Sequence, residues 1–157
     1  YRDAMAAWRY LTETRRMPAQ SIVFFGESLG GAVAAWLAER QLPGALVLYA
    51  TFTSVPDMAR KLYPILPVSI LVRMDYDTRA ALARVSCPVL IMHSSEDEIV
   101  PYAHGETLYA TAPGEKALVT LQGGHNDALF VSRERYRGAV REFLQQHFTP
   151  AGKAQAR

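Results

Sequence analysis

A serine between two glycines has the residue types and spacing of a catalytic nucleophile held on a sharp turn. The motif GESLG, residues 26–30, directly follows the short apolar run 21–25 (SIVFF) and directly precedes the alanine-rich stretch 29–40. This is G-x-S-x-G between an expected strand and an expected helix, which is the arrangement of a nucleophile elbow. The pattern predicts that Ser28 presents its hydroxyl at the edge of a sheet, where it could attack a carbonyl carbon.

The residues around Ser28 suit that role. A strained turn brings the strand and helix backbones close together, so Gly26 and Gly30 are expected to leave room where a side chain would clash, and Gly31 to extend that room. N–H groups at the start of a helix point toward developing negative charge, which makes the backbone of Leu29 a candidate oxyanion donor. The alternative is a glycine-rich turn used for packing or phosphate binding, although no P-loop Lys-Ser/Thr follows.

A serine nucleophile needs a base, and the candidates are the four histidines of the chain: His93, His104, His125 and His147. His125 lies in the loop 122–127 (QGGHND), after an expected strand, where a side chain can reach the carboxyl edge of a parallel sheet. We expect His147 to face solvent, His104 to lack a positioning context and His93 to be structural. We therefore predict His125 as the general base.

The base needs an orienting carboxylate, and three adjacent acids follow the strand expected at 88–93. They are Glu96, Asp97 and Glu98. Acid clusters in loops are usually solvated, and spacing alone does not choose among these three. The order serine, acid, histidine is the one expected of this kind of site. Asp97 is our choice and Glu96 the alternative.

Strands and helices alternate along the chain in the order that would position these groups. Short apolar runs at 21–25, 45–49, 88–93 and 117–121 are typical of strands covered on both faces, and helical patterns occupy 1–16, 29–40, 102–110 and 132–148. A proline-punctuated stretch, 51–76, separates the second and third strands, with short helical pieces expected at 57–62 and 68–73. One or two further helical turns are expected at 78–85. The pattern predicts an α/β fold with a parallel sheet.

Three segments together resemble the α/β-hydrolase superfamily. Besides the elbow, residues 93–101 (HSSEDEIVP) are similar to the family's acid loop, commonly H-G-x-x-D-x-x-V-P, which singles out Asp97, with Ser94 in place of the usual glycine. Residues 123–127 (GGHND) resemble the histidine loop of one branch, the abhydrolase-domain-containing serine hydrolases of the Bem type. Segments at 51–59 and 63–77 resemble that branch as well.

The resemblance also implies that part of the fold lies outside this chain. The family sheet has about eight strands, and its second oxyanion donor follows an early strand. Only four strands are expected here, so we expect the C-terminal part of a longer protein. Residues 1–148 would form a partial domain, with a lid-like insertion at 51–76 and a frayed tail at 149–157. Its first strand would then have an unpaired, aggregation-prone edge.

The function implied is hydrolysis of an ester, thioester or amide through an acyl-enzyme, with a peptidase-like specificity, as in prolyl oligopeptidases or aminopeptidases, as one alternative. The other alternative is a non-catalytic binding protein of the same fold, or an inactive fragment. The resemblance implies no cofactor. The expected partner is a small-molecule, acyl or peptidyl substrate. Many members of the branch are anchored in membranes by an upstream segment.

Composition excludes several other classes of protein. Of the 157 residues 50% are hydrophobic and 20% charged, which is typical of a globular domain. A net charge of +2 without a basic stripe gives no support for nucleic-acid binding. No apolar run approaches the roughly 20 residues of a membrane span. The histidines show no metal-binding spacing. The single cysteine, Cys87, is expected to be a buried core thiol. Localisation stays open.

Overall fold

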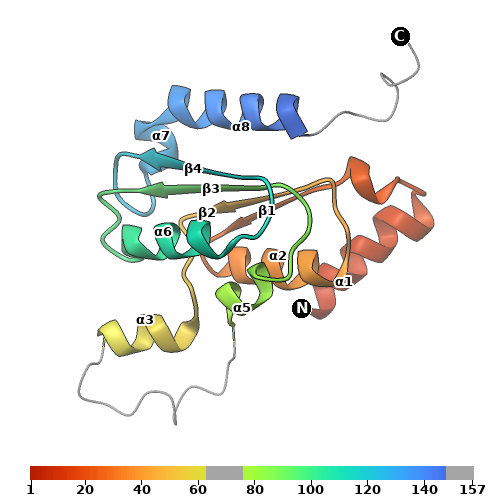
Figure 1. The fold of residues 1–157 in the computed structure, drawn as a ribbon, viewed down its shortest axis with the longest axis horizontal. Coiled ribbons are helices and arrows are strands. Elements are labelled where there is room, and N and C mark those ends of the chain that lie inside the picture. Colours follow the sequence, from red (N-terminus) through yellow and green to blue (C-terminus); the bar gives the residue numbers. More distant parts are fainter. Residues whose placement is uncertain (63–75, 148–157) are drawn as a thin grey trace.

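Four parallel strands form one sheet in the computed structural model, which describes residues 1–62 and 76–147 (Figure 1). The strands are β1 (Val23–Glu27), β2 (Ala45–Tyr49), β3 (Val89–Ser94) and β4 (Lys116–Leu121). They lie in the spatial order β1-β2-β3-β4, which is also their order along the chain. All four therefore end at the same edge of the sheet, and the loops that follow them meet there.

Helices cover both faces of the sheet because side chains of a strand alternate between its faces. On one face, Leu46, Leu48 and Ile91 pack against α2 (Leu29–Arg40), α5 (Thr78–Leu82) and α6 (Tyr102–Thr111). The alanines of α2 bring this helix close to the sheet. Figure 1 shows these helices together below the strands.

The opposite face is covered by the C-terminal helices. Val47, Leu90 and Met92 pack there against α7 (Ala128–Val131) and α8 (Arg133–His147), whose Phe143 is buried. Both central strands, β2 and β3, are thus buried on two sides, as their uninterrupted apolar sequences predict.

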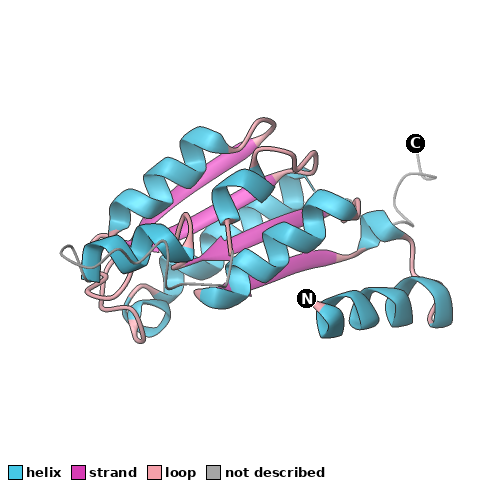
Figure 2. Ribbon diagram, turned by 90° about the horizontal axis from the view of Figure 1, so that it is seen from below, coloured by secondary structure: helices cyan, strands magenta, loops and turns pink. Residues whose placement is uncertain are grey.

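The N-terminal helix packs beside β1. It consists of α1 (Arg2–Arg9) continued by a π-helical turn, Tyr10–Thr14, and a short 3₁₀ turn, Ala19–Ser21, leads into the sheet (Figure 2). Trp8 packs with Ile22 and Leu37 and meets the ring of Phe24 edge-on at 5.4 Å between centroids.

The segment between β2 and α5 is described only at its two ends. Helix α3 (Val55–Leu62) lies at its start, and an antiparallel bridge between Ser54 and Asp77 closes its base. Phe52 is buried beside Ala32 and Val100. The residues that the sequence predicted as lid-like therefore contribute to packing where they are described. The helix expected at 68–73 and the tail expected at 149–157 lie outside the described residues.

The predicted fold class is confirmed. The sheet is parallel, and its helices lie on both faces. The main shift is in β1, which begins two residues later than expected because residues 19–21 form the 3₁₀ turn. No helix within residues 1–62 and 76–147 is both long and apolar enough to cross a bilayer.

Candidate active site

Ser28 lies on a strained turn between β1 and α2. Its backbone has φ 49° and ψ −118°, a region that non-glycine residues rarely adopt. Two contacts hold it there: the Ser28 N–H donates to the carbonyl of Tyr49 at 2.9 Å, and the hydroxyl of Thr51 donates to the carbonyl of Ser28. The turn at 26–30 thus has the backbone conformation that a nucleophile elbow requires.

The glycines of the elbow have unequal roles. A Cβ on Gly26 would lie 2.5 Å from the carbonyl oxygen of Gly30, and one on Gly31 would lie 2.4 Å from Oγ1 of Thr51. At Gly30 a Cβ would meet no described atom within 4 Å. In the described part of the chain the close approach therefore involves Gly26 and Gly31, which face β1 and Thr51, and no described atom crowds Gly30.

Asp97 and His125 are joined at the carboxyl ends of β3 and β4. The Nδ1 of His125 and the Oδ2 of Asp97 lie 2.7 Å apart, and both side chains are almost fully buried. The other oxygen, Oδ1, accepts the N–H groups of Ile99 at 3.0 Å and Val100 at 2.7 Å. One oxygen therefore fixes the acid loop, and the other lies nearest the imidazole of His125 and 3.4 Å from Nε2 of His93. No hydrogen bond or ion pair joins Glu96 to the His125 ring in the described part of the chain.

The two glutamates beside Asp97 bind the backbone of the histidine loop. An oxygen of Glu96 accepts the N–H of Gly123 at 3.1 Å, and an oxygen of Glu98 accepts the N–H of His125 at 3.0 Å. Acid clusters in loops are usually solvated, so these backbone contacts were not expected. The positions of Glu96 and Glu98 on either side of Asp97 do not indicate which backbone groups their side chains bind.

Tyr49 links the elbow to the histidine loop, a role that its sequence context did not indicate. Its carbonyl binds the N–H of Ser28, and its hydroxyl donates to the carbonyl of His125 at 3.3 Å. Burial, followed by the negative charges of Glu27 and Asp97, raises the pKa of Tyr49 to about 12. The phenol therefore stays protonated at neutral pH and remains a donor to the histidine loop.

The three predicted catalytic residues thus lie after β1, β3 and β4 at one edge of the sheet. Asp97 and His125 are in direct contact. Within the described part of the chain, no hydrogen bond joins the Ser28 hydroxyl to His125. Leu29 is the first residue of α2, so its N–H belongs to the first helical turn, where backbone donors lack intrahelical partners.

The remaining histidines occupy other environments. His93 is fully buried and its Nε2 lies 2.8 Å from the carbonyl of Val100, while its Nδ1 has no described partner. Burial lowers the pKa of His93. The Nδ1 of His104 lies 2.9 Å from Oγ1 of Thr53, which also binds Asp57. The structural role expected of His93 fits its buried position.

Two further expectations concern residues away from the site. His147 was expected to face solvent, which is wrong: its side chain is 13% exposed and its Nδ1 lies 2.7 Å from a carboxylate oxygen of Glu115. The ring also packs beside that of Phe143, with 4.9 Å between the ring centroids. Cys87 packs against the core, and burial raises its pKa to about 11, so its thiol stays protonated.

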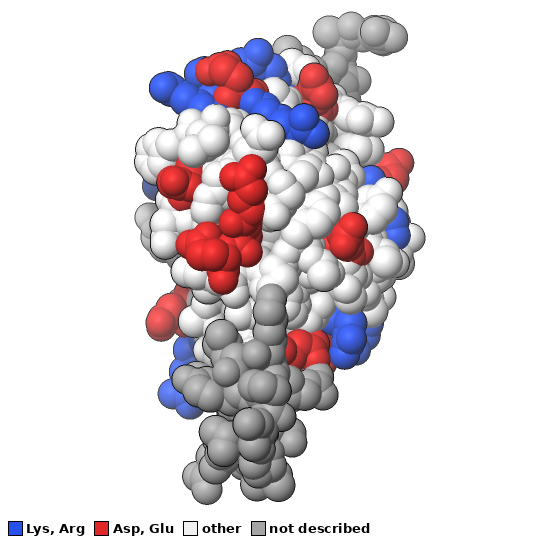
Figure 3. Space-filling view, turned by 90° about the vertical axis from the view of Figure 1, so that its left-hand side faces the viewer, with Lys and Arg blue, Asp and Glu red and all other residues white. Residues whose placement is uncertain are grey.

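The surface around the site is acidic. Figure 3 looks onto the edge at which the strands end, and Asp and Glu side chains gather in the middle of this face. Four exposed acids lie at strand ends or in the loops after them, namely Glu27, Glu96, Glu98 and Asp127. Among residues 1–62 and 76–147, no group of three or more His, Cys, Asp or Glu side chains could hold a metal ion.

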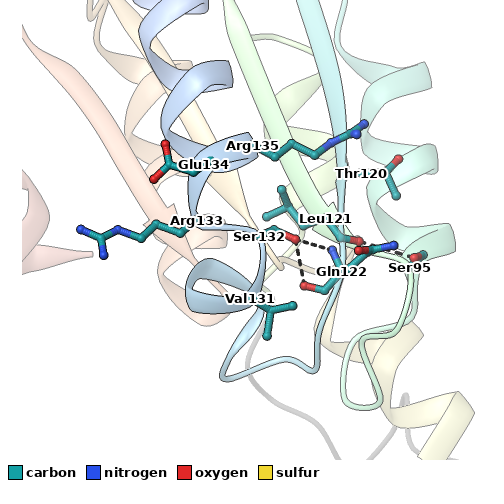
Figure 4. A pocket seen from close by; sticks show the side chains of 9 residues that line it. All are labelled: Ser95, Thr120, Leu121, Gln122, Val131, Ser132, Arg133, Glu134 and Arg135. Carbon is teal, nitrogen blue, oxygen red and sulfur yellow. Dashed lines mark hydrogen bonds between the residues drawn. The ribbon is translucent and has the colours of Figure 1, made fainter.

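A hollow of about 540 Å³ lies outside β4, next to the start of α8 (Figure 4). Ser95, Gln122 and Ser132 line it, and the Ser132 hydroxyl accepts the N–H of Gln122 at 2.7 Å. Arg133 points away from these groups in Figure 4. None of the three predicted catalytic residues lines this hollow, so it is separate from the candidate active site.

The parallel sheet, the elbow and the acid–histidine pair define an α/β-hydrolase fold. Residues 1–148 match the model of the prolyl oligopeptidase family, and the chain belongs to this family. An uncharacterized Mycobacterium tuberculosis protein is 38% identical over 145 residues, which cover 92% of this chain and 52% of that protein. The α/β-hydrolase domain-containing protein WAV2 of Arabidopsis thaliana is 33% identical, over 93% of this chain and 54% of its own length. The chain spans about half the length of these relatives.

Solved structures show the same fold. The esterase domain of a Rhodothermus marinus protein aligns with a TM-score of 0.65 and 24% identity, covering 88% of this chain and 67% of that domain. A puromycin-hydrolyzing peptidase of M. tuberculosis aligns with a TM-score of 0.70 and 21% identity, over 96% of this chain and 26% of the peptidase. At these sequence identities the alignments show a shared fold and nothing about activity.

Proposed function

We propose that the protein containing this chain is a serine hydrolase that forms an acyl-enzyme intermediate. The observation that carries the proposal is the buried 2.7 Å contact between Asp97 and His125, at the same sheet edge as the strained Ser28 turn. A buried carboxylate on Nδ1 of an imidazole holds the tautomer whose Nε2 can accept a proton. The fold and the family support hydrolysis in general, and the triad is our assignment.

In the proposed reaction Ser28 Oγ bonds to the carbonyl carbon of an ester, thioester or amide, while His125 Nε2 takes the hydroxyl proton. Asp97 stabilises the imidazolium formed. The bond to the leaving group then breaks, and the leaving group receives that proton from His125. Water repeats the two steps on the acyl-enzyme and restores Ser28. The N–H of Leu29 would stabilise the oxyanion, with a second donor from elsewhere in the whole protein.

A peptide bond is a second candidate for the scissile bond, and the match to the prolyl oligopeptidase family favours it. The proposed triad needs no additional catalytic residue to act on an ester or a thioester. The rival is a binding protein of the same fold that does not catalyse. The order and contacts of the acid and histidine favour the enzyme, because a binding protein would not need a buried carboxylate aimed at an imidazole.

The experiment is labelling of the full-length protein with a fluorophosphonate, which reacts with activated serines. We expect labelling of the wild type and none of Ser28→Ala. Ser86→Ala, at an exposed serine before β3, is the matched control and keeps wild-type labelling. If the probe does not label the folded full-length protein, the proposal that it is a serine hydrolase is refuted. Initial rates with p-nitrophenyl esters and aminoacyl amides then separate esterase from peptidase activity.

A further inference from the structure

Three consecutive acids of the loop after β3 each bind a different group of the histidine loop. Glu96 accepts from the backbone of Gly123, Asp97 binds the ring of His125, and Glu98 accepts from the backbone N–H of His125. His125 is therefore held at two points, at its main chain and at its side chain, by adjacent residues of one loop.

The geometry points to Glu98 as a positioning residue for the general base, an inference that rests on the function proposed above. A single bond from Asp97 to Nδ1 leaves the ring free to move with its backbone. The Glu98 carboxylate restricts that freedom, since it binds the His125 nitrogen at 3.0 Å, in addition to the Tyr49 hydroxyl, which binds the His125 carbonyl at 3.3 Å. The side chain reaches this nitrogen across Gly124, where a Cβ would lie 2.8 Å from Oε2 of Glu98. Gly124 thus provides the gap that the carboxylate occupies.

The contact matters for rate because proton transfer depends on the position of Nε2. A displacement of about 1 Å in a reacting group can cost about 100-fold in rate. Glu98 is itself exposed and contributes nothing to the core. Its removal should therefore change the placement of His125 without unfolding the domain, which separates a positioning role from a general structural one.

Glutamine distinguishes the hydrogen bond from the charge. Glu98→Gln keeps an acceptor oxygen for the His125 N–H, whereas Glu98→Ala removes it. We expect Glu98→Ala in the full-length protein to lower kcat by about tenfold with little change in KM, and Glu98→Gln to recover kcat to within about threefold of the wild type. Glu106→Ala, an exposed glutamate on α6, serves as the control and leaves kcat unchanged.

A second readout does not depend on catalysis. Hydrogen exchange of the His125 backbone amide, measured by NMR, should be faster in Glu98→Ala than in Glu98→Gln or the wild type. If the wild type did not react with a fluorophosphonate, the proposed enzymatic function would be refuted, but the exchange result would still test the contact between Glu98 and His125. Equal kcat in Glu98→Ala and wild type, or equal losses in the Ala and Gln variants, would overturn the positioning role.

Discussion

Asp97 and His125 lie 28 residues apart in the chain, yet Oδ2 of the first and Nδ1 of the second are 2.7 Å apart. Their neighbouring strands β3 and β4 pair in parallel from Val89–Lys116 to Ser94–Leu121, so both loops leave the sheet at the same edge. The sheet register therefore brings a carboxylate and an imidazole together, and the proposed chemistry depends on this contact.

Replacing Asp97 with asparagine should abolish most of the activity while the fold is retained. The amide oxygen can still accept the N–H groups of Ile99 and Val100, but an amide nitrogen facing Nδ1 favours the wrong tautomer of His125. We expect kcat/KM for an activated ester to fall by about 10³- to 10⁴-fold. Asp3→Asn, on the exposed face of α1, is the control. Activity of Asp97→Asn within threefold of the wild type would show that another acid orients the base.

The elbow glycines should differ sharply in their tolerance of alanine. Gly26→Ala places a Cβ 2.5 Å from backbone, which cannot yield, so we expect a loss of about 1–3 kcal/mol in the free energy of unfolding. Gly30→Ala has free space within the described structure and lies in a helix, where alanine is favoured over glycine by up to about 1 kcal/mol. Urea denaturation of both variants measures the difference. Equal destabilisation by the two substitutions would contradict the geometry.

The sequence predicted the sheet and the two site loops because these depend on local patterns. The run 45–49 is apolar throughout and forms β2 with the expected limits, and GGHND places His125 after a strand. It could not predict how Glu96 and Glu98 bind the histidine loop, or that Tyr49 connects to it. Those contacts depend on the register between strands that are distant in the chain, and the spacing of residues along the sequence does not reveal that register. His147 was misjudged for the same reason, since its ion-pair contact with Glu115 arises only when α8 packs against the sheet.

Buried His93 should make stability depend on pH. Burial lowers the pKa of His93 below its usual 6.5, so the unfolded chain takes up a proton at a higher pH than the folded chain does. Stability therefore falls as the pH drops through about 6.5, by up to about 1.4 kcal/mol per pH unit, until the lowered folded pKa is reached. Above that window His93 contributes no pH dependence.

His93→Gln tests this effect, because its amide N–H can still donate toward the carbonyl of Val100, which lies 2.8 Å from Nε2 of His93. The variant should have a lower Tm at neutral pH but a shallower decline of Tm between about pH 7 and pH 5 than the wild type. Thermal denaturation monitored by circular dichroism in matched buffers provides both slopes. Parallel slopes for the two proteins would exclude His93 as the source of the dependence.

The outer edge of β1 should make the 157-residue chain self-associate when it is produced alone. Among the described strands β1 pairs only with β2, and Phe25 on it is 48% exposed. Phe25 also lines an apolar hollow of about 390 Å³, together with Trp8 and Val33. An unpaired strand edge beside exposed apolar surface is a template for pairing with another chain. We therefore expect concentration-dependent oligomers in size-exclusion chromatography with light scattering.

Phe25→Lys should shift that equilibrium toward monomer, since a charged side chain on an edge strand opposes pairing between chains. Leu42→Lys is the matched control: Leu42 is 62% exposed but lies in the loop before β2, away from the free edge. We therefore expect Phe25→Lys to reduce self-association and Leu42→Lys to leave it unchanged. If both variants reduce it equally, general surface hydrophobicity rather than the edge of β1 drives the association.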